Sequence, residues 1–226
     1  MKSVPIVASR VMIAGMLALA SLTAAAVDFI DLRRIEAVSG DAAAGKLKAG
    51  ACIGCHGPNG IAPVPVFPNL AAQKIDYLYW SLVEFQRSAR ADSPMTAQVA
   101  KLADADLRDL AAYFASLPAS TAVPQTVAAD SRGAALFRAG DPSRGIPPCQ
   151  GCHGVEADGA AASSADARYR AYPALRGQHA NYLVQRLQDF RAGKRVDSSN
   201  DMIMRGIARS LDDDAMQDIA SWLQSQ

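Results

Sequence analysis

The chain has 226 residues, a length that allows one or two domains, and its 23 basic residues almost balance its 22 acidic ones. Residues 27–117 carry 9 basic and 10 acidic side chains, and residues 118–226 carry 12 of each. Neither half has the basic excess of a nucleic-acid-binding domain, so no nucleic-acid partner is expected.

The first 26 residues have the pattern of a secretory signal peptide. Lys2 and Arg10 precede an uncharged run over residues 11–26 that ends in small side chains. This run is about 16 residues long, which is short of the about 20 apolar residues that span a bilayer. We therefore expect cleavage after Ala26 and a periplasmic location, either free or associated with the outer face of the inner membrane. An uncleaved membrane anchor is the alternative.

The pentapeptide Cys-x-x-Cys-His occurs twice, at residues 52–56 and at residues 149–153, and uses all four cysteines. This motif is typical of covalent haem attachment, because two thiols on one helical turn reach one edge of the haem and the next residue binds the iron. The sequence therefore predicts two haem c groups. The attachment residues are Cys52 and Cys55 for the first haem and Cys149 and Cys152 for the second, with His56 and His153 as proximal iron ligands.

Paired cysteines can have roles other than haem attachment. Two Cys-x-x-Cys pairs can bind zinc, but here each pair is followed at once by a histidine and stands in its own copy of a longer repeat. A thioredoxin-like dithiol requires a strand and a helix around it, whereas these surroundings favour helix. Structural disulfides would suit an oxidising compartment. The doubled motif favours haem over all three.

An internal repeat divides the chain into two similar units. Residues 67–78 match residues 172–183 at a constant offset of 105, and the last helices match at an offset of 109. The two motifs are 97 residues apart, so the second unit holds eight extra residues, which we place in an exposed loop within residues 154–171. Self-similarity in a fixed order indicates duplication. The predicted organisation is a signal peptide over 1–26, a leader over 27–39 (a short helix or a loose segment), a first domain over 40–117, a linker over 118–126 and a second domain over 127–226.

Each unit is predicted to be helical throughout. Apolar residues recur three and four apart, and no stretch alternates persistently at a period of two, so the expected fold class is all-α. Asp104 and Asp212 stand where the N-cap or first turn of a last helix is favoured. The predicted helices are residues 41–49, 76–90 and 106–116 in the first unit and 131–139, 181–193 and 214–224 in the second.

An electron-carrying haem needs a sixth iron ligand, and methionine is a usual choice that raises the reduction potential. Met95 and Met204 each lie seven residues before a leucine that leads into the last helix of the unit. Met202 is the rival in the second unit, but its repeat equivalent is Ser93, so we prefer Met204. The expected axial pairs are His56 with Met95 and His153 with Met204.

Further residues are candidates for the surroundings of each haem. Pro68 and Pro173 hold matching places after the motifs, and their carbonyls are expected to orient the proximal histidines. Matching glutamine and tyrosine residues, Gln73 with Tyr77 and Gln178 with Tyr182, are either haem-edge contacts or packing residues. His179 has Lys74 as its repeat partner and is expected to lie at the surface or to form a hydrogen bond.

Each unit resembles a class I cytochrome c, and the tandem arrangement resembles the cytochrome c4 family. The likeness covers residues 40–226 and includes Gly45 and Gly133 in the first helices, with Leu110 and Tyr113 or Ile219 and Trp222 in the last. The resemblance implies two tandem domains, each wrapped around one haem, with approximate two-fold symmetry and propionate edges that meet between the domains. Ala72 departs from the pattern, since the second unit has Gly177 in its place.

The function that these features predict is a dihaem electron carrier and not an enzyme. The resemblance implies delivery of electrons to a terminal oxidase, and the expected donor is a quinol-cytochrome c reductase-type complex or a dehydrogenase. A cytochrome subunit bound to a dehydrogenase or oxidase is the alternative. A dihaem peroxidase is disfavoured, because matched methionines are available to occupy the sixth coordination position of both irons.

Overall fold

A computed structural model of the chain describes residues 28–87, 90, 93–119, 127–159 and 166–226. The predicted signal peptide, most of the predicted linker and part of the predicted loop in the second unit lie outside these residues. The described residues form helices, and among them β-structure is limited to isolated bridges between Ile30 and Ser198 and between Asp141 and Ile146. The all-α prediction is confirmed.

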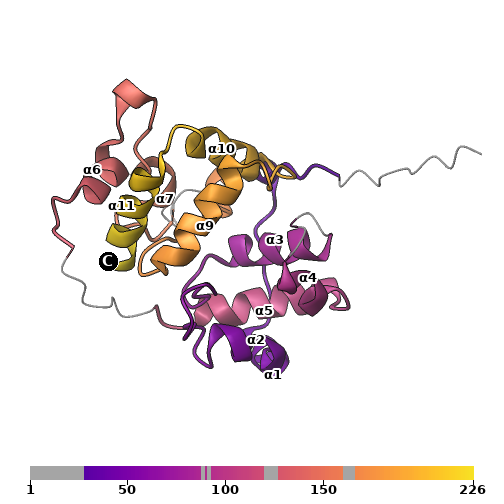
Figure 1. Cartoon of the computed structure of the whole chain (residues 1–226). Coiled ribbons are helices and arrows are strands. Elements are labelled where there is room, and N and C mark those ends of the chain that lie inside the picture. The colour runs from indigo at the N-terminus through magenta and orange to yellow at the C-terminus, as the bar shows by residue number, and fades with distance from the viewer. Residues whose placement is uncertain (1–27, 88–89, 91–92, 120–126, 160–165) are drawn as a thin grey trace, which may run out of the picture.

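The helices form two groups that follow one another along the chain (Figure 1). The first group contains α1 (Ala42–Lys48), α2 (Gly50–His56), α3 (Ile75–Gln86), α4 (Pro94–Val99) and α5 (Asp104–Ser116). The second contains α6 (Arg132–Ala139), the 3-10 turn η2 (Pro142–Arg144), α7 (Gln150–His153), α8 (Ala167–Arg170), α9 (Ala180–Arg191), α10 (Ser199–Ala208) and α11 (Asp213–Gln224). The predicted helices are all present with ends shifted by a few residues. The helices α2, α4, α7, α8 and α10 lie outside the predicted ranges, and α8 falls within the stretch that was predicted to be an exposed loop.

Polar side chains fix where several helices begin. Asp41 accepts hydrogen bonds from the amides of Ala43 and Ala44 at the start of α1, and Asp212 accepts one from Ala215 at the start of α11. Asp104 is the first residue of α5 and not its N-cap, a place that suits a carboxylate near the positive end of the helix dipole.

In each domain the first helix crosses the last at very short range. A Cβ atom on Gly45 of α1 would lie 2.0 Å from the carbonyl oxygen of Asp109 in α5, and one on Gly133 of α6 would lie 2.1 Å from that of Asp218 in α11. Glycine is therefore required at both crossings. The same close approach of the first and last helices is present in both domains.

Ala72 adopts a left-handed backbone conformation with φ of 55°, as does its repeat equivalent Gly177 with φ of 64°. This region costs an L-residue roughly 1 kcal/mol, whereas glycine enters it freely. We therefore expect Ala72→Gly to raise the free energy of unfolding by about 0.5–1 kcal/mol, measured by chemical denaturation of the holoprotein. The matched variant Gly177→Ala should lower the free energy of unfolding by a similar amount. A destabilised Ala72→Gly variant would contradict the left-handed conformation assigned to Ala72.

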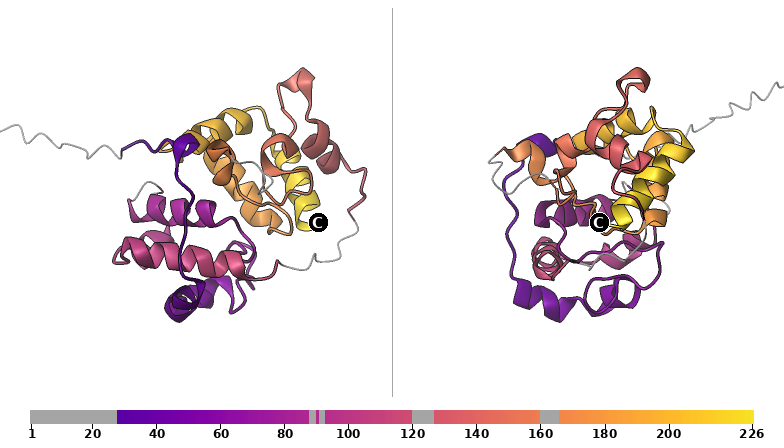
Figure 2. Two further views of the ribbon diagram at one scale, coloured as in Figure 1. Left: turned by 180° about the vertical axis from the view of Figure 1, so that it is seen from behind. Right: turned by 90° about the vertical axis from the view of Figure 1, so that its left-hand side faces the viewer.

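The leader is an ordered segment that crosses both domains. It contains the 3-10 turn η1 (Leu32–Arg34), and Figure 2 shows its indigo trace passing from the second domain down the side of the first. The amide of Ile30 donates to the carbonyl of Asp197 at 2.8 Å, and the amide of Val38 donates to Asp76 of α3 at 2.9 Å. The leader therefore connects the two domains.

Each domain has its own hydrophobic core, and a smaller cluster lies under the leader. Ile30, Leu32 and Ala171 form this third cluster, with Trp80 and Val83 of α3 packed against it.

Among the described residues, no helix is long and apolar enough to cross a membrane.

Candidate haem centres and the domain interface

The two motif histidines occupy equivalent positions at the ends of α2 and α7. Nδ1 of His56 lies 2.9 Å from the carbonyl oxygen of Pro68, and Nδ1 of His153 lies 2.9 Å from that of Pro173. Because a carbonyl can only accept, Nδ1 carries the proton in both rings and Nε2 keeps its lone pair for a metal. Burial lowers the pKa of both imidazoles and so favours this neutral, ligating form.

The four cysteines lie on or beside the same helical turns, and none of them is part of a disulfide. Burial raises the pKa of Cys52 and Cys152, and raises that of Cys149 to about 11. Such thiols differ from the low-pKa cysteines of dithiol oxidoreductases. In the described part of the chain no group of three or more histidine, cysteine, aspartate or glutamate residues lies close enough to hold a metal ion.

The candidate methionines differ in their surroundings. Met95 packs against the same core as Cys52, and Met204 packs against the same core as Cys149. Met202 is 47% exposed and lies on another face of α10. Met204 is therefore better placed than Met202 to face the interior of the second domain.

The predicted glutamines form hydrogen bonds across the domain interface. Nε2 of Gln73 donates to the carbonyl of Ala174 at 2.9 Å, and Oε1 accepts from the Ala174 amide at 2.8 Å. Gln178 repeats this arrangement on Asn69, at 3.0 and 2.9 Å. The amide groups of both glutamines thus bind the backbone of the opposite domain.

His179 also contributes to the interface, where its Nε2 donates to the carbonyl of Ala62 at 3.0 Å. This matches the prediction of a hydrogen-bonding role. Tyr182 lies near Tyr77 of the other domain, and burial, followed by the nearby Tyr77, raises the pKa of Tyr182 well above its ordinary value.

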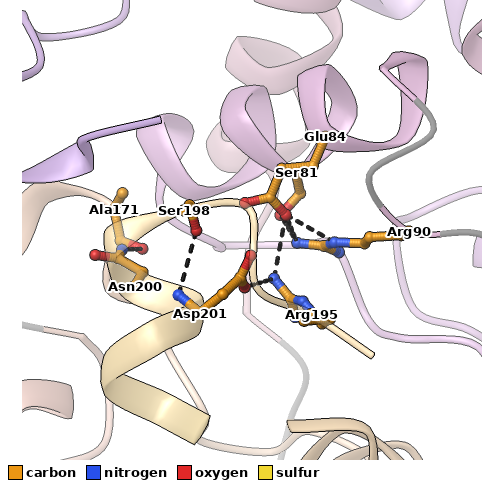
Figure 3. Close-up of polar contacts among 8 residues, drawn as sticks. All are labelled: Ser81, Glu84, Arg90, Ala171, Arg195, Ser198, Asn200 and Asp201. Carbon is orange, nitrogen blue, oxygen red and sulfur yellow. Dashed lines mark hydrogen bonds and ion pairs between the residues drawn. The ribbon is translucent and has the colours of Figure 1, made fainter. Parts of the chain in front are cut away.

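A buried group of charged residues joins the domains, and sequence reasoning missed it (Figure 3). Glu84 of α3 accepts from Nε of Arg90 at 2.7 Å and from Nη2 of Arg195 at 3.2 Å. Arg195 also pairs with Asp201 of α10 at 2.8 Å. We call Glu84, Arg90, Arg195 and Asp201 the buried ionic cluster; the side chain of Glu84 is only 3% exposed.

The two arginines are repeat equivalents, but their carboxylate partners are not arranged symmetrically. Arg90 and Arg195 stack on the equivalent rings of Phe85 and Phe190, at 4.6 and 4.4 Å. Both then converge on Glu84 of the first domain. Its repeat equivalent, Asp189, instead pairs within the second domain, for example with Arg186 at 2.7 Å. The repeat could locate the arginines but not this shared carboxylate.

The ionisation of the buried carboxylates follows from this arrangement. Burial acts to raise the pKa of Glu84, but Arg90 and Arg195 together outweigh it and hold the pKa below its ordinary value. Burial raises the pKa of Asp201, and Arg195 offsets only part of that effect. Glu84 is therefore the firmly ionised carboxylate between the two arginines.

The residues near the interface suit the carboxylate groups of haem. Nε1 of Trp80 and the Nε atoms of Arg186 and Arg195 are buried, and have no hydrogen-bond partner among the residues that the structure describes. Buried N–H groups are normally paired, and a carboxylate is a strong acceptor for them. Haem c carries two propionates, and buried donors of this kind are chemically suited to bind them.

Comparisons with known proteins agree with this description. A family model described as cytochrome c matches residues 42–118 and again residues 131–226. Cytochrome c4 from Pseudomonas aeruginosa is 40% identical over 188 residues, covering 82% of this chain and 89% of that protein. The crystal structure of reduced recombinant cytochrome c4 from Pseudomonas stutzeri has a TM-score of 0.72 and 36% identity, covering 83% of this chain and 99% of that one. A Stutzerimonas stutzeri protein named thiosulfate dehydrogenase electron acceptor is 34% identical over 175 residues, covering 76% of this chain and 77% of that protein.

Two helical domains in tandem, each with one haem attachment motif, define a dihaem c-type cytochrome. The predictions of fold class and of two covalently attached haem c groups are confirmed. The chain belongs to the cytochrome c4 family. It is an electron-transfer protein and not an enzyme.

Proposed function

We propose that the chain is a periplasmic carrier in which His56 and Met95 bind one haem iron and His153 and Met204 bind the other. The observation that carries this proposal is the pairing of each methionine with the motif of its own domain, since each packs against the same core as the first motif cysteine. The haem irons supply two one-electron couples. The prolines hold each imidazole by a 2.9 Å hydrogen bond, which fixes its orientation at the iron.

Absorption spectroscopy of the ferric protein tests the ligands. A methionine-to-iron charge-transfer band in the near-red is expected for both haems, without a high-spin signal. Met204→Ala should remove about half of the band intensity and lower the potential of one haem, because methionine ligation raises it. Met202→Ala is the matched control and should leave the band intact. Loss of the band in Met202→Ala would contradict the choice of Met204.

The same spectra separate a carrier from a peroxidase. With both irons closed by methionine, the resting protein should not react promptly with hydrogen peroxide, since catalysis needs an open iron and acid-base groups beside it. A high-spin haem at rest and rapid oxidation by peroxide would favour the peroxidase.

For the partners, we propose a terminal oxidase as acceptor and a quinol-cytochrome c reductase-type complex or a dehydrogenase as donor. The name of one relative, thiosulfate dehydrogenase electron acceptor, favours a dehydrogenase donor. Stopped-flow reduction of the holoprotein by each purified candidate donor, followed by oxidation with membrane oxidases, distinguishes these partners. Co-purification of a dehydrogenase or oxidase in stoichiometric amounts would instead favour a permanent cytochrome subunit.

The periplasmic location rests on the signal-peptide pattern of residues 1–26. Fractionation of cells that express the full chain, with N-terminal sequencing of the mature protein, tests it. A new N-terminus at Val27 in the periplasmic fraction is the expected result. An intact N-terminus in the membrane fraction would favour the anchor, and a cleaved protein that sediments with membranes would favour peripheral association.

A further inference from the structure

The two interface glutamines contact the same peptide groups that orient the proximal histidines. The peptide between Pro68 and Asn69 accepts a hydrogen bond from His56 through its carbonyl oxygen and donates one to Oε1 of Gln178 through its N–H. These distances are both 2.9 Å. Gln178 belongs to the second domain and His56 to the first. One peptide group therefore links a proximal histidine to a side chain of the other domain.

An equivalent series of hydrogen bonds links His153 of the second domain to Gln73 of the first domain. The peptide between Pro173 and Ala174 accepts from His153 at 2.9 Å and donates to Oε1 of Gln73 at 2.8 Å. Each glutamine oxygen also accepts from the amide of its own next residue, Lys74 or His179, at 2.9 and 3.1 Å. Both glutamines are buried, at 7% and 6% exposure, so water does not compete for these bonds.

Hydrogen bonds in series through one peptide strengthen each other. When the N–H of a peptide donates, negative charge on its carbonyl oxygen increases, and the bond that this oxygen accepts becomes stronger. A stronger bond from Nδ1–H makes the imidazole a better electron donor to its metal. Better donation favours the oxidised iron, so it lowers the reduction potential.

We propose that Gln178 and Gln73 are positioning residues that act across the domain interface, each setting the reduction potential of the haem in the opposite domain through the peptide behind its proximal histidine. This inference rests on the proposed assignment of His56 and His153 as iron ligands. It identifies a means by which the two haem domains influence one another without a contact between the haems.

The peptide groups behind the two proximal histidines are not held in place equally well. The side chain of Asn69 accepts from the Ala62 amide at 2.9 Å and donates to the Gly177 carbonyl at 3.0 Å, which holds its peptide in place independently of Gln178. Ala174 has no polar side chain to do the same. Loss of Gln73 therefore removes both polarisation and orientation, whereas loss of Gln178 removes mainly polarisation.

The test is a redox titration followed by NMR, in which the haem methyl signals report the two haems separately. The variants Met95→Ala and Met204→Ala show which signals belong to the haem of which domain. Gln178→Met, a near-isosteric change, should shift the reduction equilibrium of the first-domain haem about three- to tenfold toward the reduced form; tenfold is about 59 mV for one electron. Gln73→Met should shift the second-domain haem by at least as much. In each variant the haem of the same domain should shift less.

His179→Leu is the matched control, because it removes an interdomain hydrogen bond to Ala62 without touching the peptide behind His56. It should leave the first-domain potential within about twofold of the wild-type equilibrium. An equal shift of both haems, a shift confined to the mutated domain, or the same shift in His179→Leu would overturn the inference. If Gln178→Met does not yield folded holoprotein, Gln73→Met carries the same test. Failure of the proposed methionine ligands is seen separately, as a wild-type ferric spectrum without the near-red band, and does not affect the histidine contacts on which this inference rests.

Discussion

Replacing Glu84 by glutamine is expected to destabilise the protein by about 3–5 kcal/mol, because it removes the negative charge that pairs with two buried guanidinium groups. Arg90 and Arg195 both contact Glu84, and all three side chains are almost fully buried. Glutamine keeps the shape but removes the charge. Chemical denaturation of the holoprotein, followed by far-UV circular dichroism, measures the loss.

Glu156→Gln is the matched control for this change. Glu156 pairs with Arg176 at 3.6 Å, but both side chains are at least half exposed, and exposed pairs contribute little to stability. The denaturation midpoint of this variant should remain close to that of the wild type. Equal effects of the two substitutions would contradict the role assigned to the buried ionic cluster.

The pH dependence of the Glu84→Gln effect has a definite sign. The pKa of Glu84 in the folded protein lies below the ordinary 4.5, so its charge contributes stability that is complete above 4.5 and is lost as the pH falls toward the lower value. The difference in unfolding free energy between wild type and variant should therefore be constant above about pH 6 and narrow in acid. A difference that widens in acid would contradict the lowered pKa.

Replacing Gly133 by alanine is expected to cost about 3 kcal/mol, at the upper end of the range for overpacked sites. The added Cβ would meet the backbone carbonyl oxygen of Asp218 at 2.1 Å and its carbon at 2.6 Å. Backbone atoms cannot rotate away as a side chain does, so α6 and α11 would have to move apart. Urea denaturation of the holoprotein measures the change.

Gly50→Ala is the control, since a Cβ at this helical position would meet nothing within 4 Å. Alanine is a better helix former than glycine, so this variant should gain up to about 1 kcal/mol. A Gly133→Ala variant as stable as the wild type would show that the crossing can relax. Haem absorbance measured in parallel reports whether the second haem site is disturbed, because α6 leads through η2 to α7.

The sequence was sufficient to predict the parts of the molecule that repeat in order along the chain. The two pentapeptides, the prolines behind their histidines and the tandem helical domains all follow from local patterns at fixed offsets. The structure adds hydrogen bonds from His56 to Pro68 and from His153 to Pro173, which were expected from the spacing.

The interface could not be predicted in the same way, because its contacts pair residues that are not repeat equivalents. Gln178 contacts Asn69, while the repeat equivalent of Gln178 is Gln73. Two-fold symmetry places each glutamine against the other domain, and a linear comparison of the two units does not show this. The shared carboxylate of Glu84 is still harder to predict, because it breaks the symmetry.

The leader has a consequence for the order in which the protein matures. The amide of Leu32 donates to the Ser199 hydroxyl at 3.0 Å, across 167 residues of sequence. Residues 28–38 are made before either domain, yet part of their binding surface is completed only when α10 has been synthesised. Contacts of such separation form late, since the loop between them must close first. The contacts of the leader with the second domain can therefore form only after those with the first, such as the hydrogen bond from Val38 to Asp76, have become available.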